Sequence, residues 1–200
     1  MPSDDTYLTI KAPAEGLCRE KMSKFIAFAH PVSSADEAMD VVAAYRKKYH
    51  DARHVCWAYM VGPERSKFLS NDNGEPSGTA GKPILGQINS LGLTDVVVVV
   101  VRYFGGIKLG TSGLIAAYRE AAREALTAAE IVERYVMLPL SFSYPYIVMN
   151  DVMKTVRQPG VEVTSQTFDN MCEMTISARA SLLPAISAKL SDIDSLTINS

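Results

Sequence analysis

Six consecutive valines, Val96–Val101, restrict the fold of this chain more than any other feature. A β-branched run favours a strand, and strand side chains point alternately to opposite faces. A strand that is apolar on both faces must be covered on both, so the run predicts a central strand over residues 95–103. It is also far shorter than the roughly 20 apolar residues that span a bilayer, so no membrane partner is expected.

The apolar periodicity around this strand predicts an α+β fold in two domains. An α/β domain is expected over residues 1–133 and a second domain over 134–200. The order of elements expected in the second domain, β-α-β-β-α-β, is that of a ferredoxin-like fold. In the first domain, strands are expected over 7–12, 24–30, 54–60, 67–70 and 95–103, and helices from residue 34, over 83–91 and over 114–130.

Charge and cysteine usage exclude several classes of protein. The formal net charge is -2, from 20 basic and 22 acidic residues, so nucleic-acid binding would require a local basic patch. Arg46-Lys47-Lys48 with Arg53 is the densest basic cluster. The three cysteines form no CxxC pair, which argues against a disulfide framework or a zinc site. The N-terminal segment lacks the apolar core of a signal peptide, so a cytoplasmic protein is expected.

Glycine is concentrated in the middle of the chain: ten of the twelve lie between Gly62 and Gly113. Many belong to two segments that each join a predicted strand to a predicted helix. The first segment, residues 71–83, is interpreted as a candidate anion site, because open backbone amides and a helix N-terminus favour negative charge. The alternative is a turn-rich connector whose polar side chains cap backbone groups. Its candidate site residues are Glu75, Ser77, Gly78, Thr79 and Lys82.

The second segment, residues 102–114, is interpreted as a surface for a nucleic-acid backbone. Basic side chains can meet phosphate, and aromatic rings can stack on bases. Its spacing matches neither a Walker A loop nor GxGxxG. The alternative is that its aromatic residues belong to the core and its glycines allow a close helix–strand approach. The candidates are Arg102, Tyr103, Gly105, Gly106, Lys108, Gly110 and Ser112, with Phe104 as a further stacking ring.

No set of residues suited to catalysis or metal binding is evident. His50 and His54 lack a third ligand, and Cys56 in an apolar strand is interpreted as a buried thiol. Glu75 has only Asp72 as a nearby acidic companion, and no Ser-His-Asp pattern occurs. No catalytic residue, metal or cofactor is therefore expected, and an enzyme is the less favoured interpretation.

Two long stretches resemble the signature segments of the IMPACT/YigZ family: NDNGEPSGTAGKPIL at 71–85 and VVVVVRYFGGIKLGTSGLIAAYREAA at 97–122. HVCWAY at 54–59 resembles the strand before the first signature. The resemblance implies a first domain like a ribosomal protein and domain IV of elongation factor G, and a second like domain V of that factor. One departure is Asn73, where the family pattern commonly has Asp, which argues against an obligatory two-acid metal site.

Three functions follow from these observations. The favoured one is a non-enzymatic protein that binds RNA or the ribosome and regulates translation, as the resemblance implies. The alternatives are a protein-interaction regulator of translation or stress signalling, and an enzyme acting on a phosphorylated or nucleotide substrate. The favoured function requires the two glycine-rich segments to converge on one receptor for negative charge, while the sequence leaves the oligomeric state open.

Overall fold

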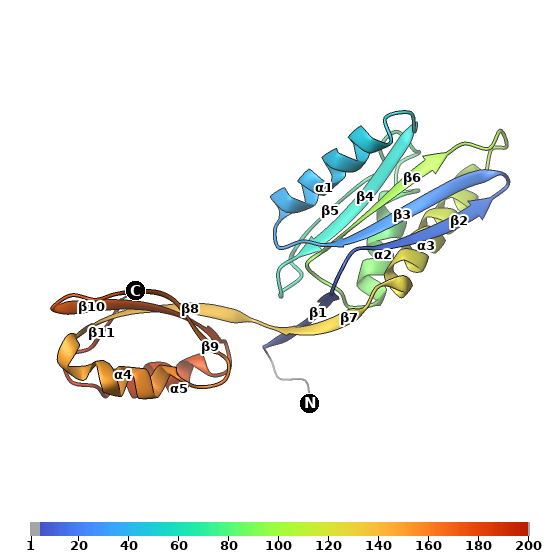
Figure 1. The fold of residues 1–200 in the computed structure, drawn as a ribbon. Coiled ribbons are helices and arrows are strands. Elements are labelled where there is room, and N and C mark those ends of the chain that lie inside the picture. The colour runs from blue at the N-terminus through green and yellow to red at the C-terminus, as the bar shows by residue number, and fades with distance from the viewer. Residues whose placement is uncertain (1–4, 200) are drawn as a thin grey trace. The chain divides into compact units, whose positions relative to one another are not determined.

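The computed structural model describes residues 5–199, which divide into two compact units (Figure 1). The N-terminal unit is Tyr7–Arg134, and the C-terminal unit is Tyr135 onward together with residues 5 and 6. Both units combine helices with β-sheet, so the predicted α+β class is confirmed. No helix among residues 5–199 is long and apolar enough to cross a membrane.

The N-terminal unit is built on a five-stranded antiparallel sheet with the order β2-β3-β6-β4-β5. The valine run lies in the central strand β6, as predicted, and all six valines are buried. Val96, Val98 and Val100 face one core cluster, and the three alternate valines face another. The strands are β2 (Ala14–Glu20), β3 (Ser23–Pro31), β4 (His54–Val61), β5 (Lys67–Asn71) and β6 (Val96–Tyr103).

Helices cover both faces of this sheet, which explains why β6 is apolar throughout (Figure 1). Helix α1 (Ala35–Lys48) packs on one face; α2 (Gly81–Ser90) and α3 (Gly110–Ala128) pack on the other. The predicted starts of α2 and α3 were wrong by two and four residues, because each helix begins at a glycine within the predicted loop. The second glycine-rich loop is therefore shorter than expected, since residues 110–113 form the first turn of α3.

Two strands of the N-terminal half were not predicted from the sequence. Strand β2 forms an edge of the sheet, next to β3. Strand β7 (Ile131–Tyr135) pairs with β1 (Thr6–Ile10) in a separate two-stranded sheet.

The C-terminal unit has a four-stranded sheet with the order β11-β8-β10-β9 and two helices, as a ferredoxin-like fold requires. The predicted β-α-β-β-α-β order is confirmed. Phe142 and Tyr144 are fully buried in its core, whereas Ser141 and Thr175 join their hydroxyls at 2.9 Å on the other face of the sheet. The elements are β8 (Met137–Pro145), η1 (Tyr146–Val148), α4 (Met149–Val156), β9 (Val161–Thr167), β10 (Met171–Arg179), α5 (Leu183–Ser191) and β11 (Thr197–Asn199).

Candidate anion-binding cleft

Residues from both glycine-rich segments border one cleft of about 390 Å³ in the N-terminal unit. The first segment contributes Glu75 and Pro76, and the second contributes most of the remaining lining. We call this the β6–α3 cleft, because it lies where the chain passes from β6 into α3. It is lined by Arg53, His54, Glu75, Pro76, Arg102, Phe104, Lys108, Leu109, Gly110, Thr111 and Leu114.

The backbone amides of the first segment are already occupied by a carboxylate of the chain itself. Asp72 Oδ1 accepts from the amides of Ala80 and Gly81 at 2.9 and 2.8 Å, and Oδ2 accepts from Gly78 at 2.8 Å. Burial opposes the charge on Asp72, but these amides and the nearby Lys82 outweigh it and lower its pKa. The anion cradle expected here therefore exists, but Asp72 fills it and caps α2.

The other candidates of the first segment do not gather in the β6–α3 cleft. Thr79 is buried and donates its hydroxyl to the carbonyl of Pro76 at 2.6 Å. Gly78 and Lys82 line a different hollow, beside α2 and α3, and Ser77 is exposed outside the lining of the cleft. The alternative of a self-capping connector describes this segment better than an external anion site does.

Asn73 has a defined structural role in place of the usual aspartate. It adopts a left-handed conformation with φ +41°, which asparagine tolerates better than most residues. Its side-chain oxygen accepts from the Val55 amide at 2.8 Å, and its carbonyl accepts from His54 Nδ1 at 2.9 Å. Residues 5–199 contain no group of three His, Cys, Asp or Glu side chains that could hold a metal ion.

Glu75 lies under the cleft as part of a buried network. Its Oε1 accepts from Arg102 Nη1 at 2.6 Å and from the Tyr118 hydroxyl at 2.7 Å. Cys56 Sγ lies 3.3 Å from the same hydroxyl. Burial raises the pKa of Cys56 to about 12, and burial with nearby Cys56 and Glu75 raises the pKa of Tyr118. Tyr118 lies in the second resembling stretch but was not among the predicted site residues.

Arg102 is buried rather than exposed, which corrects the expectation of a surface phosphate contact. It is 6% exposed, and its guanidinium lies between the rings of Phe25 and Phe104, at 5.4 and 5.6 Å from their centroids. Its pairing with Glu75 cancels its charge and links the two segments. Only Nη1 makes a hydrogen bond, and the buried Nε has no partner among residues 5–199.

Of the remaining candidates, only Lys108 and Gly110 line the cleft. Tyr103 packs on the opposite face of the sheet with the α1 cluster and donates its hydroxyl to Asp51 at 2.8 Å, so it is not available for stacking here. Gly105 has no room for a side chain, since a Cβ would lie 2.1 Å from the Met22 carbonyl carbon. Gly106 and Ser112 are exposed outside the lining.

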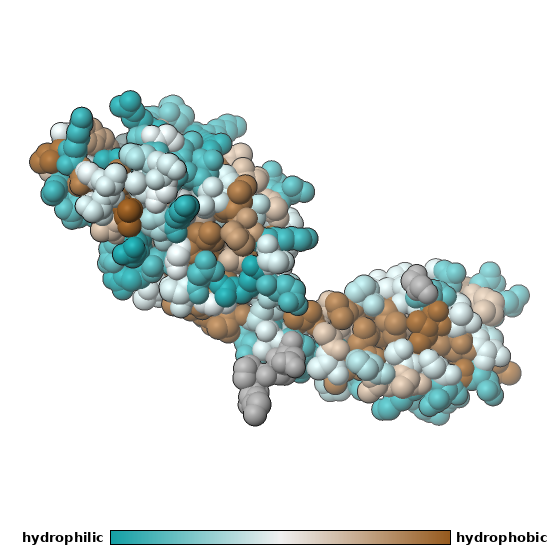
Figure 2. Space-filling model, turned by 180° about the vertical axis from the view of Figure 1, so that it is seen from behind, coloured by the Kyte–Doolittle hydropathy of each residue, from teal (hydrophilic) through white to brown (hydrophobic). Residues whose placement is uncertain are grey.

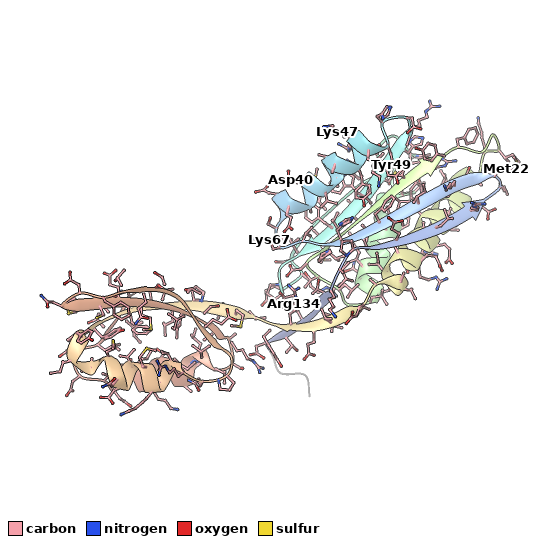
Figure 3. The ribbon with its side chains drawn as sticks, viewed as in Figure 1. Met22, Asp40, Lys47, Tyr49, Lys67 and Arg134 are labelled. Atoms are coloured by element: carbon pink, nitrogen blue, oxygen red, sulfur yellow. The ribbon has the colours of Figure 1, made fainter. Side chains whose placement is uncertain are left out.

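The cleft lies at an end of the N-terminal unit where basic side chains gather. Strand register places Lys24 opposite Tyr103, and His54, next to Arg53, opposite Arg102. Helix α1 ends close by in sequence, and Figure 3 shows Lys47 and Met22 toward this end and Lys67 and Arg134 toward the other. Hydrophobic and hydrophilic atoms are mixed here (upper left in Figure 2). We call Arg19, Lys24, Arg46, Lys47, Lys48, Arg53 and Lys108 the basic end; Glu20 and Asp51 are acids close to it in sequence.

Comparison with known proteins identifies the family. Residues 21–126 match the family model of the Impact N-terminal domain. The chain belongs to the IMPACT family. It is 37% identical over 153 residues to IMPACT family member YvyE of Bacillus subtilis (strain 168), covering 76% of this chain and 70% of that protein. It is 30% identical over 190 residues to IMPACT family member YigZ of Escherichia coli (strain K12), covering 94% and 93%.

A solved structure, described as that of a hypothetical protein, resembles this IMPACT family chain over nearly its full length. The TM-score is 0.78 at 29% identity, with 99% of this chain and 98% of that chain covered. The resemblance found in the signature segments is thus confirmed, and the match to YigZ extends across the sequence of both units.

Proposed function

We propose that this IMPACT family chain acts in translation, in the cytoplasm, by binding RNA, free or in the ribosome, through the basic end. The supporting observation is that no basic side chain of this set forms an ion pair within residues 5–199. Unpaired cations grouped at one place are available to phosphates, whereas the net charge of -2 is unfavourable elsewhere on the surface. The role in translation rests on the family and on the domains of elongation factor G that the family resemblance implies.

The proposal predicts strongly salt-dependent binding. Each phosphate that a side chain neutralises on a single strand contributes about -0.7 to the slope of log K against log salt. About four contacts would give a slope of about -3, and removal of one contact should reduce its magnitude by about 0.7.

The test is fluorescence anisotropy with labelled single-stranded RNA, together with co-sedimentation with ribosomes, both at low salt. Lys47→Ala and Arg53→Ala should each weaken binding several-fold and flatten the salt slope. Lys67→Ala is the matched control, because Lys67 is exposed at the opposite end of the sheet (Figure 3). No affinity for RNA or ribosomes at low salt, or an equal loss with the control, would refute the proposal.

A second candidate function, protein interaction, is supported by an exposed apolar group on the C-terminal unit. Ile147 is 89% exposed and Tyr146 is 58% exposed beside a hollow of about 620 Å³ that also includes Met149. Large exposed apolar residues in one place are typical of surfaces that bind partners. Capture from nuclease-treated extract, lost with Ile147→Asp and retained with Lys47→Ala, would favour this function over RNA binding.

A further inference from the structure

The first turn of α3 differs from that of α2 in having no anion of its own. The residue before the helix is Leu109, which offers no side-chain hydrogen bond, and the first turn contains no acidic residue. The first amides of any α-helix lack intrahelical acceptors, and they carry the positive end of the helix dipole. Asp72 satisfies this need in α2. In α3, the first two residues of the helix, Gly110 and Thr111, line the β6–α3 cleft.

Arg102 provides a second, independent sign that an acceptor belongs in this cleft. Only 6% of its surface is exposed, and it lines the cleft. Its Nε has no hydrogen-bond partner in the described part of the chain. Within residues 5–199, Nη2 also makes no hydrogen bond, but unlike Nε it is not fully buried. A charged guanidinium with unsatisfied donors is costly to bury, and an oxyanion in the cleft would satisfy one of them by accepting from Nη2, the donor that is not fully buried.

The lining also specifies the kind of anion. Lys108 and Arg53 are exposed, form no ion pair within residues 5–199, and both border the cleft, so cations outnumber the one buried carboxylate there. Phe104 is 54% exposed, with Arg102 against its ring on one side. An open aromatic ring stacks well on a base. The volume of about 390 Å³ lies within the range of small-ligand sites.

We propose that the β6–α3 cleft binds one nucleotide of an RNA strand, with its phosphate at the N-terminus of α3 and its base on Phe104. Lys108 and Arg53 hold the phosphate from the rim, and Arg102 donates from below. This inference rests on the proposed function, and it adds a defined site to an otherwise sequence-independent basic end. Phosphate and base are recognised together, so neither half of the nucleotide alone should bind as well.

The test is an NMR titration of the full chain with adenosine 5′-monophosphate, adenosine and inorganic phosphate. The monophosphate should shift the amide signals of Gly110 and Thr111 in a saturable way, at least tenfold more tightly than adenosine or phosphate. Phe104→Leu should weaken the monophosphate about tenfold and leave phosphate unchanged. Lys108→Ala should weaken both. Lys82→Ala is the matched control without effect, because Lys82 lies outside this cleft, beside the helix terminus that Asp72 already fills.

Several outcomes would overturn the nucleotide site. These are no saturable shift at Gly110 with millimolar monophosphate, equal affinity for adenosine, or phosphoserine binding as tightly while Phe104→Leu has no effect. Retained RNA binding with no monophosphate response overturns this inference alone and leaves the proposed function in place. Saturable monophosphate binding without any RNA binding instead removes the proposed function while supporting a phosphate-and-base site.

Discussion

The carboxylate of Asp72 makes the first glycine-rich segment testable without any ligand. Replacing it with asparagine keeps one oxygen, which can still accept from Ala80 and Gly81. The other oxygen becomes an NH₂ group that faces the amide of Gly78, so a donor meets a donor. Asp72→Asn therefore removes one hydrogen bond, weakens two from charged to neutral, and removes an anion from the N-terminus of α2.

The expected cost follows from these three contacts. A hydrogen bond to a charged group contributes about 1.5–3 kcal/mol, and loss of a helix cap costs about 0.5–2 kcal/mol. Because the same atoms are counted in both, we expect Asp72→Asn to lower the free energy of unfolding by about 2–3 kcal/mol at pH 7.

The effect should also depend on pH in a defined direction. Folding lowers the pKa of Asp72 below its unfolded value of about 3.9, so its contribution is present above that value. It is lost as pH falls through the folded pKa and the carboxyl becomes protonated. The gap between wild type and Asp72→Asn should therefore be constant near neutral pH and shrink below about pH 4.

Urea unfolding followed by tryptophan fluorescence measures this directly. Trp57 is the single tryptophan of the chain and is buried in the N-terminal unit, so its emission reports that unit. Asp40→Asn is the control, because Asp40 is exposed on α1 and makes no ion pair within residues 5–199. Equal midpoints for the two variants at pH 7, or a gap that widens in acid, would refute the reasoning.

Four other substitutions or reactions test separate parts of the structure. Gly86→Ala should stabilise the N-terminal unit by about 1 kcal/mol, since Gly86 lies inside α2 with open space at its Cβ. Gly105→Ala should instead destabilise the same unit by about 3 kcal/mol, because the new Cβ would overlap with the β2–β3 turn. Urea unfolding followed by tryptophan emission measures both variants, and stability changes of the same sign would contradict these expectations. Cys56 should resist a thiol reagent at pH 8 until the chain unfolds, because burial raises its pKa to about 12; rapid native labelling would disprove it. Asp5→Ala should lower the free energy of unfolding of the C-terminal unit by about 2 kcal/mol, because it removes the carboxylate that lies 2.9 Å from the Arg179 guanidinium. Circular dichroism should show a shifted unfolding transition of this unit, while the transition followed by tryptophan emission stays unchanged.

The sequence predicted those elements whose side chains differ strongly between faces or are uniformly apolar. Strand β6 has six buried valines, and the C-terminal unit alternates clearly enough for its order of elements to be predicted. Strand β2 was missed because its inward residues are small rather than large and apolar. Gly16 is an example: a Cβ there would lie 2.2 Å from the amide nitrogen of Ala125 in α3, so the close approach of the helix requires glycine.

The site was harder to predict because its charges are paired over long separations. Glu75 and Arg102 are 27 residues apart, and only the sheet register and the fold of the loop bring them within 2.6 Å. The sequence correctly placed these two charged residues at the site, but it did not indicate that they form an ion pair in which the charges cancel. The face on which Tyr103 lies was predictable from strand alternation, because it follows the inward-facing Arg102 by one residue.

The two glycine-rich segments look alike in composition, yet one difference in sequence separates their roles. The first contains Asp72, which accepts hydrogen bonds from the backbone amides of its own segment, whereas residues 102–114 contain no acid at all.

An acid placed in the first turn of α3 should therefore reproduce the self-capped state. Thr111→Asp, at an exposed position of that turn, should stabilise the N-terminal unit by about 0.5–1 kcal/mol through the helix dipole. The same substitution should abolish binding of adenosine 5′-monophosphate, because the new carboxylate competes for the amides and repels phosphate. Thr111→Asn is the control, because asparagine has nearly the shape of aspartate without its charge; it should retain most of the affinity for the monophosphate. If Thr111→Asp leaves monophosphate binding unchanged while raising stability, the anion does not bind at this helix terminus.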